Sequence, residues 1–287
     1  MPRLLTVGHV TWDRRAGGDV LGGAVSYAAL AARRLGWEAA IVTSAAPDFE
    51  PERDLPGVTC FVTTASATTR FINEEQADGT RRQQVLSRAS DVLLDQVPQE
   101  WRDPDVLLLA PVIGEVPPGT AQAFDATTVG AVAQGWLRRL EDDGTVAQRL
   151  WAEPWRDLAG VHIAFLSEHD HDEGVDGAKG LLQCVPFVSV TRGVRGSVLL
   201  DRSGALEIAA WPRPVVDTTG AGDVFATAFL LRYHEAGDPL EAAAFAACAA
   251  SCAVEGVGAS TLGDRAEVQR RMGLRERFLE EGDRDED

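Results

Sequence analysis

The chain has 287 residues, of which 45% are hydrophobic and 25% charged, and its formal net charge is −17. This is the composition of a globular protein, long enough to bury a large core as one large α/β domain or two small ones. A surface of that sign repels phosphate backbones and anionic lipid, so nucleic acid and membranes are poor partners. The sequence contains no run of about 18 apolar residues, so we expect no transmembrane helix.

The beginning of the chain, MPRLLTVGHV, turns polar too early for a secretion signal, and the four cysteines include no CxxC pair. We therefore expect a cytoplasmic protein with reduced cysteines. Lys179 is the only lysine in the sequence and it follows Ala178. The phosphate loop GxxxxGK[ST] is thus absent, so any nucleotide phosphates must be held in another way.

The N-terminal residues predict a strand–loop–helix–strand unit. Residues 4–7 are apolar and 11–20 are polar and rich in glycine, which indicates a buried strand followed by a loop or edge hairpin. Gly22-Gly23 precedes an alanine-rich helix over 24–35, and 39–43 predict the next strand. This order favours a parallel sheet.

The segment 58–88 has a different pattern. Residues 58–64, 68–73 and 81–86 are short alternating runs rich in Val, Thr and Phe, and Asp78-Gly79 is a hairpin-turn signal. We interpret this segment as an antiparallel flap inserted into the α/β body.

From residue 105 the α/β pattern returns and ends in a charged tail. Strands are predicted at 106–109, 129–133, 161–166, 187–190, 197–200 and 206–209, and helices at 178–184, 221–235, 240–254 and 264–271. Residues 275–287 are charged and acidic, which predicts a solvated tail.

The heptapeptide 217–223, Asp-Thr-Thr-Gly-Ala-Gly-Asp, stands before the apolar run 224–231. Small residues that lead into a helix N-terminus leave backbone N–H groups open at its positive end, which makes an anion site. Asp223 beside that site would repel a phosphate, unless it takes a proton from a hydroxyl that attacks phosphorus. An Asp cap after a glycine turn is the plainer interpretation of a lone GAGD.

The heptapeptide resembles the C-terminal signature of the ribokinase family of carbohydrate kinases (phosphofructokinase B type). Residues 21–24, Leu-Gly-Gly-Ala, resemble that family's di-glycine substrate motif, and 191–196 resemble its T-x-G-x-x-G nucleotide loop. Residues 165–170 stand where the family carries N-x-x-E. The resemblance covers roughly residues 4–272.

This resemblance implies a fold and a domain plan. The fold is α/β, a ribokinase-like three-layer αβα sandwich with a mostly parallel central sheet and a small β lid. Residues 1–272 form the kinase domain, with lid segments at about 11–20 and 58–88, and 273–287 form an acidic C-terminal tail. A homodimer through the lid is also implied.

The resemblance further implies roles for individual residues. The catalytic base is Asp223, and the anion hole consists of the amides of Gly220, Ala221 and Gly222. The substrate would be bound by Asp13, Gly22, Gly23 and Tyr27. The nucleotide phosphates would lie near Thr191, Gly193, Gly196 and Thr219. ATP is the implied donor, and a monovalent cation such as K⁺ would bind near Asp217 and Thr219.

Two departures from the family pattern bear on substrate and metal. Tyr27 stands where the family has asparagine, which favours an acceptor other than ribose or fructose phosphate, such as the cyclitol myo-inositol. In N-x-x-E, Ser167 replaces asparagine and Asp170 replaces glutamate, so both side chains are shorter. Mg²⁺ would then be held through water, with Glu168 or Asp170 supplying the charge.

Three other segments have two interpretations each. Residues 134–138 follow a predicted strand and either pack or contribute to the site. Arg70 on the flap either lies at the surface or reaches a phosphate. His169 and His171 alternate with aspartates, which indicates a hydrated loop rather than a metal site.

The sequence therefore predicts MgATP-dependent phosphorylation of a hydroxyl on a small sugar or polyol. A helix N-terminus favours the anion, so we expect Asp223 to be ionised. Proton transfer must accompany phosphoryl transfer, because a carboxylate is too weak a base to ionise a free alcohol beforehand. The alternatives are a nucleoside kinase of the same fold and a catalytically silent, ligand-sensing homologue.

Overall fold

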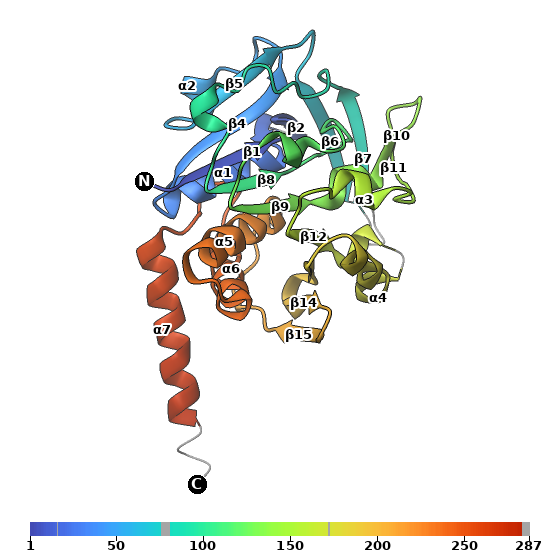
Figure 1. The fold of residues 1–287 in the computed structure, drawn as a ribbon. Helices are drawn as coiled ribbons and strands as arrows, with labels where there is room; N and C mark the ends of the chain where they lie inside the picture. The colour runs from blue at the N-terminus through green and yellow to red at the C-terminus, as the bar shows by residue number, and fades with distance from the viewer. Residues whose placement is uncertain (16, 76–80, 172, 283–287) are drawn as a thin grey trace.

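The computed structural model describes residues 1–15, 17–75, 81–171 and 173–282. Within them, nine strands form one sheet in the order β15-β14-β13-β12-β9-β8-β1-β4-β5 (Figure 1). These strands are β1 (Arg3–Val7), β4 (Glu38–Ala45), β5 (Thr59–Thr64), β8 (Val106–Leu109), β9 (Thr128–Val132), β12 (Ile163–Ser167), β13 (Phe187–Thr191), β14 (Ser197–Asp201) and β15 (Gly204–Ile208).

The sheet is mostly parallel, as the strand–helix–strand order predicts. Every neighbouring pair from β13 across to β5 is parallel, and β14 and β15 are added antiparallel at one edge. The strands in the middle of the sheet are buried on both faces. Their sequences are therefore nearly continuous in apolar residues rather than alternating between apolar and polar ones. The predicted α/β fold class is confirmed.

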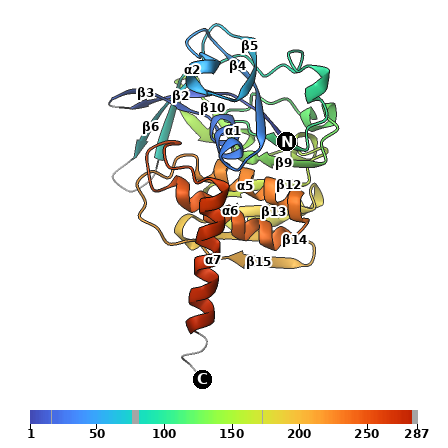
Figure 2. The ribbon, with the colours of Figure 1, turned by 90° about the vertical axis from the view of Figure 1, so that its left-hand side faces the viewer.

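Helices cover the two faces of the sheet unequally. One face packs on α1 (Ala24–Arg34), α5 (Ala221–Ala236) and α6 (Pro239–Ala253), which share one core with Leu4, Ile41 and Leu108 (Figures 1 and 2). The other face, with Leu5 and Leu107, is covered by loops and short helices. The short helices are α2 (Pro51–Asp54), α3 (Pro154–Asp157), α4 (Gly174–Ala178), and the 3-10 helices η1 (Gln99–Trp101), η2 (Thr120–Ala123), η3 (Ala133–Leu137), η4 (Glu168–Asp170), η5 (Lys179–Gln183) and η6 (Gly193–Arg195).

A second sheet contains the predicted lid segment 11–20 and the later part of the segment 58–88, and we call this sheet the lid. Its order is β3-β2-β6-β7, built from β2 (Thr11–Arg15), β3 (Gly18–Gly22), β6 (Thr69–Glu75) and β7 (Arg81–Ser87). A hairpin of β10 (Arg138–Leu140) and β11 (Val146–Gln148) lies beside β7, where Val85 N–H donates to the Gly144 carbonyl at 2.8 Å.

The expected lid segment 58–88 begins too early. Thr59–Thr64 is β5, the edge strand of the main sheet, which pairs in parallel with β4. An edge strand is half solvated, so it alternates as a lid strand does and the pattern alone does not separate the two. The predicted Asp78-Gly79 turn lies outside the described residues.

Two helices differ from their predicted bounds. The helix expected over 178–184 is divided into α4 and η5, and α7 (Arg265–Gly282) continues well past 271. Glu, Arg and Leu in 275–281 are strong helix formers, which outweighs their charge. Among the described helices, none has the length and apolar character needed to cross a bilayer.

Candidate active site

The predicted motifs meet where the parallel strands end. Ser167 closes β12 and Thr191 closes β13, in register with each other, and η3 follows directly on β9. The carboxyl ends of parallel strands are where α/β sheets bind ligands. Helix α5 packs on β8, β9 and β12. Asp223 in its first turn is close enough to Arg138 and Asp170, which follow β9 and β12, for their charges to act on it, so the N-terminus of α5 belongs to the same end of the fold.

The turn before α5 is shaped by glycine. Gly220 has φ +78°, and a Cβ there would lie 2.3 Å from the Tyr27 ring, so no larger residue fits. The Ala221 N–H donates to the Thr218 carbonyl at 3.3 Å. Within the described chain, the Gly220 and Gly222 N–H groups have no backbone acceptor, and a Cβ on Gly222 would meet nothing within 4 Å. The turn is therefore open to an anion at Gly222.

Asp223, in the first turn of α5, is not the ordinary carboxylate that the sequence predicts. Burial raises its pKa to about 7, Arg138 lowers the pKa and Asp170 raises it further. The expectation of a fully ionised base is wrong because it weighed only the helix N-terminus, whereas desolvation disfavours the charged form more strongly. Near pH 7 the group exchanges a proton readily, as a general base must.

Asp217, at the other end of the heptapeptide, is held in the opposite state. Burial alone would raise its pKa. Hydrogen bonds from Thr219, Arg15 and the Gly258 N–H outweigh this and lower the pKa to about 2. The Oδ1 atom accepts from Thr219 N–H at 2.9 Å, and Oδ2 accepts from Arg15 Nη2 at 3.0 Å and from Gly258 N–H at 3.3 Å. Asp217 therefore ties the turn to its surroundings as a permanent anion.

The di-glycine brings the lid strand β2 close to α1. A Cβ on Gly22 would lie 2.8 Å from Asp13 Oδ2, and a Cβ on Gly23 would lie 2.4 Å from the His9 carbonyl. Gly23 also has φ +89°. These glycines therefore make room for Asp13 and for the backbone that leads into the lid, and Asp13 itself is 9% exposed.

Tyr27 lies among the acidic groups of the site. Its side chain is 4% exposed and its ring packs against Gly220. Burial raises the pKa of the Tyr27 phenol, and the charges of Asp13, Asp217 and Asp223 raise it further, whereas Arg15 lowers it. The residue that replaces the family's asparagine thus stands where the lid, α1 and the α5 turn come together.

The predicted donor loop connects β13 to β14. Gly193 and Gly196 have φ +57° and +82°, and a Cβ on Gly196 would lie 2.0 Å from the Ile208 carbonyl, so this glycine lets β15 pack. Thr191 donates from Oγ1 to the Leu166 carbonyl at 3.3 Å. Arg195 forms an ion pair with Glu168, which links this loop to η4.

Glu168 and Asp170, the predicted magnesium ligands, already have partners. Asp170 accepts from Ser167 N–H at 2.7 Å as one half of a capping box on η4, and it also accepts from Gln134 Nε2 at 3.2 Å. No cluster of three potential ligands occurs in the described parts of the chain. A carboxylate oxygen has a second lone pair, so this pair fits a Mg²⁺ that arrives with donor phosphates and keeps its water, rather than a preformed metal centre.

Sequence reasoning undervalued residues 134–138 and missed Arg15. Gln134 contacts Asp170, and the Arg138 charge acts directly on Asp223. A polar residue directly after a strand of a parallel sheet was the available signal for 134–138. Arg15 comes from a lid strand 202 positions before Asp217, and nothing local in the sequence indicates that contact.

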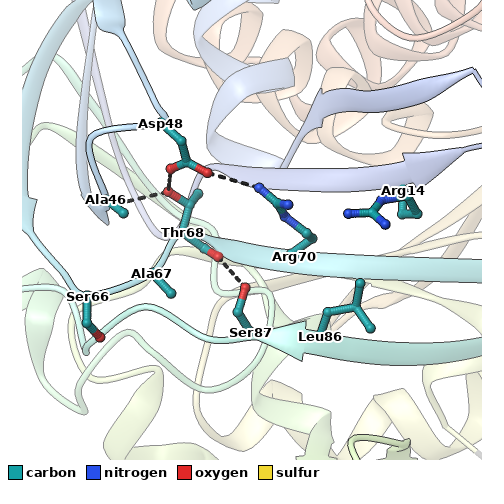
Figure 3. Close-up of a pocket in the computed structure, with 9 residues that line it drawn as sticks. All are labelled: Arg14, Ala46, Asp48, Ser66, Ala67, Thr68, Arg70, Leu86 and Ser87. Carbon is teal, nitrogen blue, oxygen red and sulfur yellow. Dashed lines mark hydrogen bonds and ion pairs between the residues drawn. The ribbon is translucent and has the colours of Figure 1, made fainter.

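Arg70 does not join the site. Side chains alternate along a strand, and Arg70 pairs in register with Trp12 while Phe71 pairs with Asp13, so Arg70 lies on the lid face opposite Asp13. There it pairs with Asp19 and Asp48 at 2.9 Å each. Figure 3 shows this face, where Arg70, Asp48 and Thr68 line a shallow cavity of about 400 Å³ together with Arg14, Ala46, Ser66, Ala67, Leu86 and Ser87.

The two histidines behave as a surface loop. The His169 side chain is 87% exposed, and the His171 ring nitrogen Nδ1 accepts from Glu173 N–H at 3.3 Å. In this geometry His169 and His171 do not converge on a common point, which agrees with a hydrated loop.

Comparisons with known proteins agree with this fold and with the predicted motifs at the carboxyl end of the sheet. Residues 148–265 match the model of the pfkB family carbohydrate kinases. The bifunctional protein HldE of Coxiella burnetii is 37% identical over 76 residues, which are 26% of this chain and 16% of that relative. The chain thus matches only about a sixth of the length of that relative.

Solved structures share the fold over nearly the whole chain. A pyrophosphate-dependent kinase in the ribokinase family, complexed with a pyrophosphate analog and myo-inositol, has a TM-score of 0.79 at 18% identity and covers 93% of this chain and 99% of its own. Arabidopsis thaliana ribokinase, complexed with ribose and ATP, has a TM-score of 0.69 at 22% identity, with coverages of 94% and 98%. The predicted resemblance to ribokinase-type carbohydrate kinases is confirmed.

Proposed function

We propose that this protein transfers the γ-phosphoryl group of ATP to a hydroxyl of a small, uncharged sugar or polyol. One observation carries the proposal: a buried carboxyl with its pKa raised to about 7 lies at the first turn of a helix whose N-terminus is open at Gly222. An anion site beside a proton acceptor is the combination that phosphoryl transfer to an alcohol needs.

In the proposed mechanism, Asp223 accepts the proton of the attacking hydroxyl as its oxygen bonds to the γ-phosphorus, while the bond from that phosphorus to the bridging oxygen breaks and ADP leaves. The open N–H groups of Gly220 and Gly222 face the transferring phosphoryl group and stabilise its developing charge. The Ala221 N–H, which bonds to Thr218, fixes the turn that presents them. Arg138 balances part of the negative charge near Asp223. A magnesium ion carried by the donor would neutralise phosphate charge beside Glu168 and Asp170.

The charges around Tyr27 support an uncharged acceptor. Three carboxylates, of Asp13, Asp217 and Asp223, act on this one phenol, and Arg15 is the cation among the groups that act on it. A sugar phosphate would meet net repulsion there, whereas hydroxyl groups can donate to carboxylates. We propose a cyclitol such as myo-inositol as the first acceptor to test, because Tyr27 changes the shape of the pocket.

A nucleoside acceptor is the second candidate for the same reaction. Tyr27 and Phe71 are both buried and lie on the acceptor side of the lid, since Phe71 pairs with Asp13 in register, and an aromatic pair can stack on a base. A silent, ligand-sensing homologue is the third candidate, favoured by the Arg195–Glu168 ion pair that occupies the altered metal motif.

We include a cytoplasmic setting and a homodimer through the lid in the proposal. The four cysteines are free thiols, which suits a reducing compartment. For the dimer, the lid face opposite Asp13 carries Leu86, which is 45% exposed beside Arg14 and Arg70. Light scattering at micromolar concentration is expected to give a dimer that Leu86→Asp dissociates. A monomeric wild type would contradict it.

The decisive experiment is a phosphorylation screen of purified protein. Ribose, fructose, myo-inositol, adenosine and uridine are each incubated with MgATP or with magnesium pyrophosphate, and ADP or phosphate release is measured with Asp223→Asn as the blank. We expect acceptor-dependent ADP formation with a sugar or polyol. Turnover of the nucleosides alone favours the second candidate, and ligand-induced stabilisation without turnover favours the third.

A further inference from the structure

An ion pair joins the tip of the lid to the phosphoryl-binding turn. Arg15 is the last residue of β2, and its Nη2 lies 3.0 Å from Asp217 Oδ2. Alternation along β2 places Arg15 on the same lid face as Asp13. The preceding residue, Arg14, lies on the opposite face and pairs with Asp19 instead. Two adjacent arginines therefore serve different faces of the lid.

The Asp217 carboxylate has little capacity left for a metal ion. Both oxygens accept N–H donors: Oδ1 from Thr219, and Oδ2 from Arg15 and from Gly258. The Asp217 carboxylate has about four lone-pair positions, and three of them accept hydrogen bonds. One of the three donors is the positively charged guanidinium of Arg15. A monovalent cation at this carboxylate, which the family resemblance implied, would face that guanidinium at close range. The residues present do not fit it.

Arg15 also offsets part of the negative charge that the site's aspartates concentrate around Tyr27. Asp13, Asp217 and Asp223 all act on the Tyr27 phenol, and Arg15 opposes them. The Arg15 side chain is 34% exposed, so it can move into solvent when the lid lifts. Asp217, which is 13% exposed, then loses its charged partner and keeps the N–H donors of Thr219 and Gly258. A cation carried on the lid is present at the turn only when the lid is down.

We propose that Arg15 is a positioning residue that takes the place of a monovalent cation at Asp217 and couples lid closure to the arrangement of the phosphoryl-binding turn. The inference rests on the proposed function. With the lid down, Arg15 holds Asp217, and Asp217 holds the turn through Thr219 and Gly258. Phosphoryl transfer is thereby favoured only when the lid excludes water from the site.

The first test needs no substrate. Amide hydrogen exchange is measured on the full chain for wild type, Arg15→Gln and the matched control Arg14→Gln. We expect exchange at 217–222 and at the β2–β3 hairpin to become about tenfold faster in Arg15→Gln, while 217–222 is unchanged in Arg14→Gln. Equal exchange at 217–222 in wild type and Arg15→Gln overturns the proposal.

The second test asks whether a free cation is needed. Thermal unfolding of the wild type is compared in KCl, NaCl and choline chloride at one ionic strength, and the transition is expected at the same temperature within about 1 °C. A stabilisation by K⁺ of several degrees over choline contradicts the replacement of the cation. Turnover of MgATP with myo-inositol in the three salts is expected to agree within about twofold.

The third test separates charge from bulk. Arg15→Gln is expected to lower kcat about 10–100-fold with little change in the KM for ATP, and Arg15→Lys to restore at least about a third of wild-type kcat. A kcat for Arg15→Gln within twofold of the wild type refutes the role. If the wild type phosphorylates no acceptor in the screen, the proposed function fails, and hydrogen exchange and the salt series still decide the Arg15 contact.

Discussion

The two ends of the heptapeptide 217–223 hold the same side chain in opposite states. Asp217 has its pKa lowered to about 2 because hydrogen bonds from Thr219, Arg15 and Gly258 outweigh its burial. Asp223 has its pKa raised to about 7 because burial dominates and the nearby Arg138 only partly offsets it. Six positions apart on one short loop, one carboxylate is a fixed anion and the other is poised to exchange a proton.

This difference shows what assigns the two roles. N–H donors surround Asp217, so its negative charge is used structurally, to fasten the turn to the lid and to the loop at Gly258. Asp223 lies at the helix start beside Asp170, in a place that penalises charge. A permanent anion is a good anchor and a poor proton acceptor near neutral pH, and the reverse holds for Asp223. Variants that exchange or remove these states test the comparison.

The largest effect is expected for Asp223→Asn. An amide of the same shape cannot accept the proton of the attacking hydroxyl, so turnover should fall by about three orders of magnitude or more, with nucleotide binding retained. Initial rates and nucleotide titration by calorimetry measure the two quantities. Wild-type turnover in this variant would remove Asp223 from the reaction.

A smaller effect is expected for Asp217→Asn. The amide loses the charge opposite Arg15 and replaces one acceptor oxygen by a donor, so kcat should fall about 10–100-fold and the free energy of unfolding by about 1–3 kcal/mol. Asp19→Asn is the matched control, since Asp19 pairs with Arg14 and Arg70 on the outer lid face. Urea unfolding and initial rates should separate the two variants. Equal losses of kcat and of unfolding free energy in the two variants would contradict an anchoring role for Asp217.

The pH dependence of kcat/KM sharpens the comparison further. Since Asp223 must be deprotonated to act, kcat/KM should rise about tenfold per pH unit below a midpoint near pH 7. Asp170 raises the pKa of Asp223, so Asp170→Asn should move the midpoint to lower pH, and Arg138→Gln should move it to higher pH. A midpoint near pH 4 in the wild type would show that burial does not control this group.

The smallest effect concerns stability. The pKa of Asp223 is raised on folding, so the stability that this group contributes is complete below about pH 4 and is lost as the pH rises through about 7. Asn at this position does not titrate. The melting temperature of Asp223→Asn relative to the wild type should therefore increase between pH 4 and 7 and level off above, by roughly 5–10 °C in all. A difference that is constant with pH would contradict the raised pKa.

The fold was largely predictable because its main sheet strands are buried on both faces. Residues 106–109 and 198–200 are continuous apolar runs, and both lie in strands of the main sheet. The wrong assignment of residues 59–64 to the lid also follows from the degree of burial. Residues 59–64 alternate because they form a half-solvated edge, and a lid strand alternates for the same reason, so periodicity alone could not assign β5.

The candidate site was predictable as far as local chain geometry determines it. The glycines at 22, 23 and 220 predict that other groups approach the backbone closely. In the structure these groups are Asp13, His9 and Tyr27 respectively. The state of Asp223 was not predictable, because it depends on burial in the folded chain and on the charges of Arg138 and Asp170, which lie far from it in the sequence. Nor was the Arg15–Asp217 contact predictable, since nothing in the sequence near either residue indicates that the two side chains meet.

The ion pair between Arg15 and Asp217 spans 202 positions of the chain, and Asp217 in turn accepts from Gly258. A ribosome adds about 5–20 residues per second, so the N-terminal hairpin emerges roughly 10–40 seconds before the carboxylate that it clasps. Until then, its guanidinium is available to other acidic segments of the nascent protein. The turn over 217–222 is thus among the last parts to be completed during synthesis, and a fragment released before Gly258 has appeared would be unable to finish it.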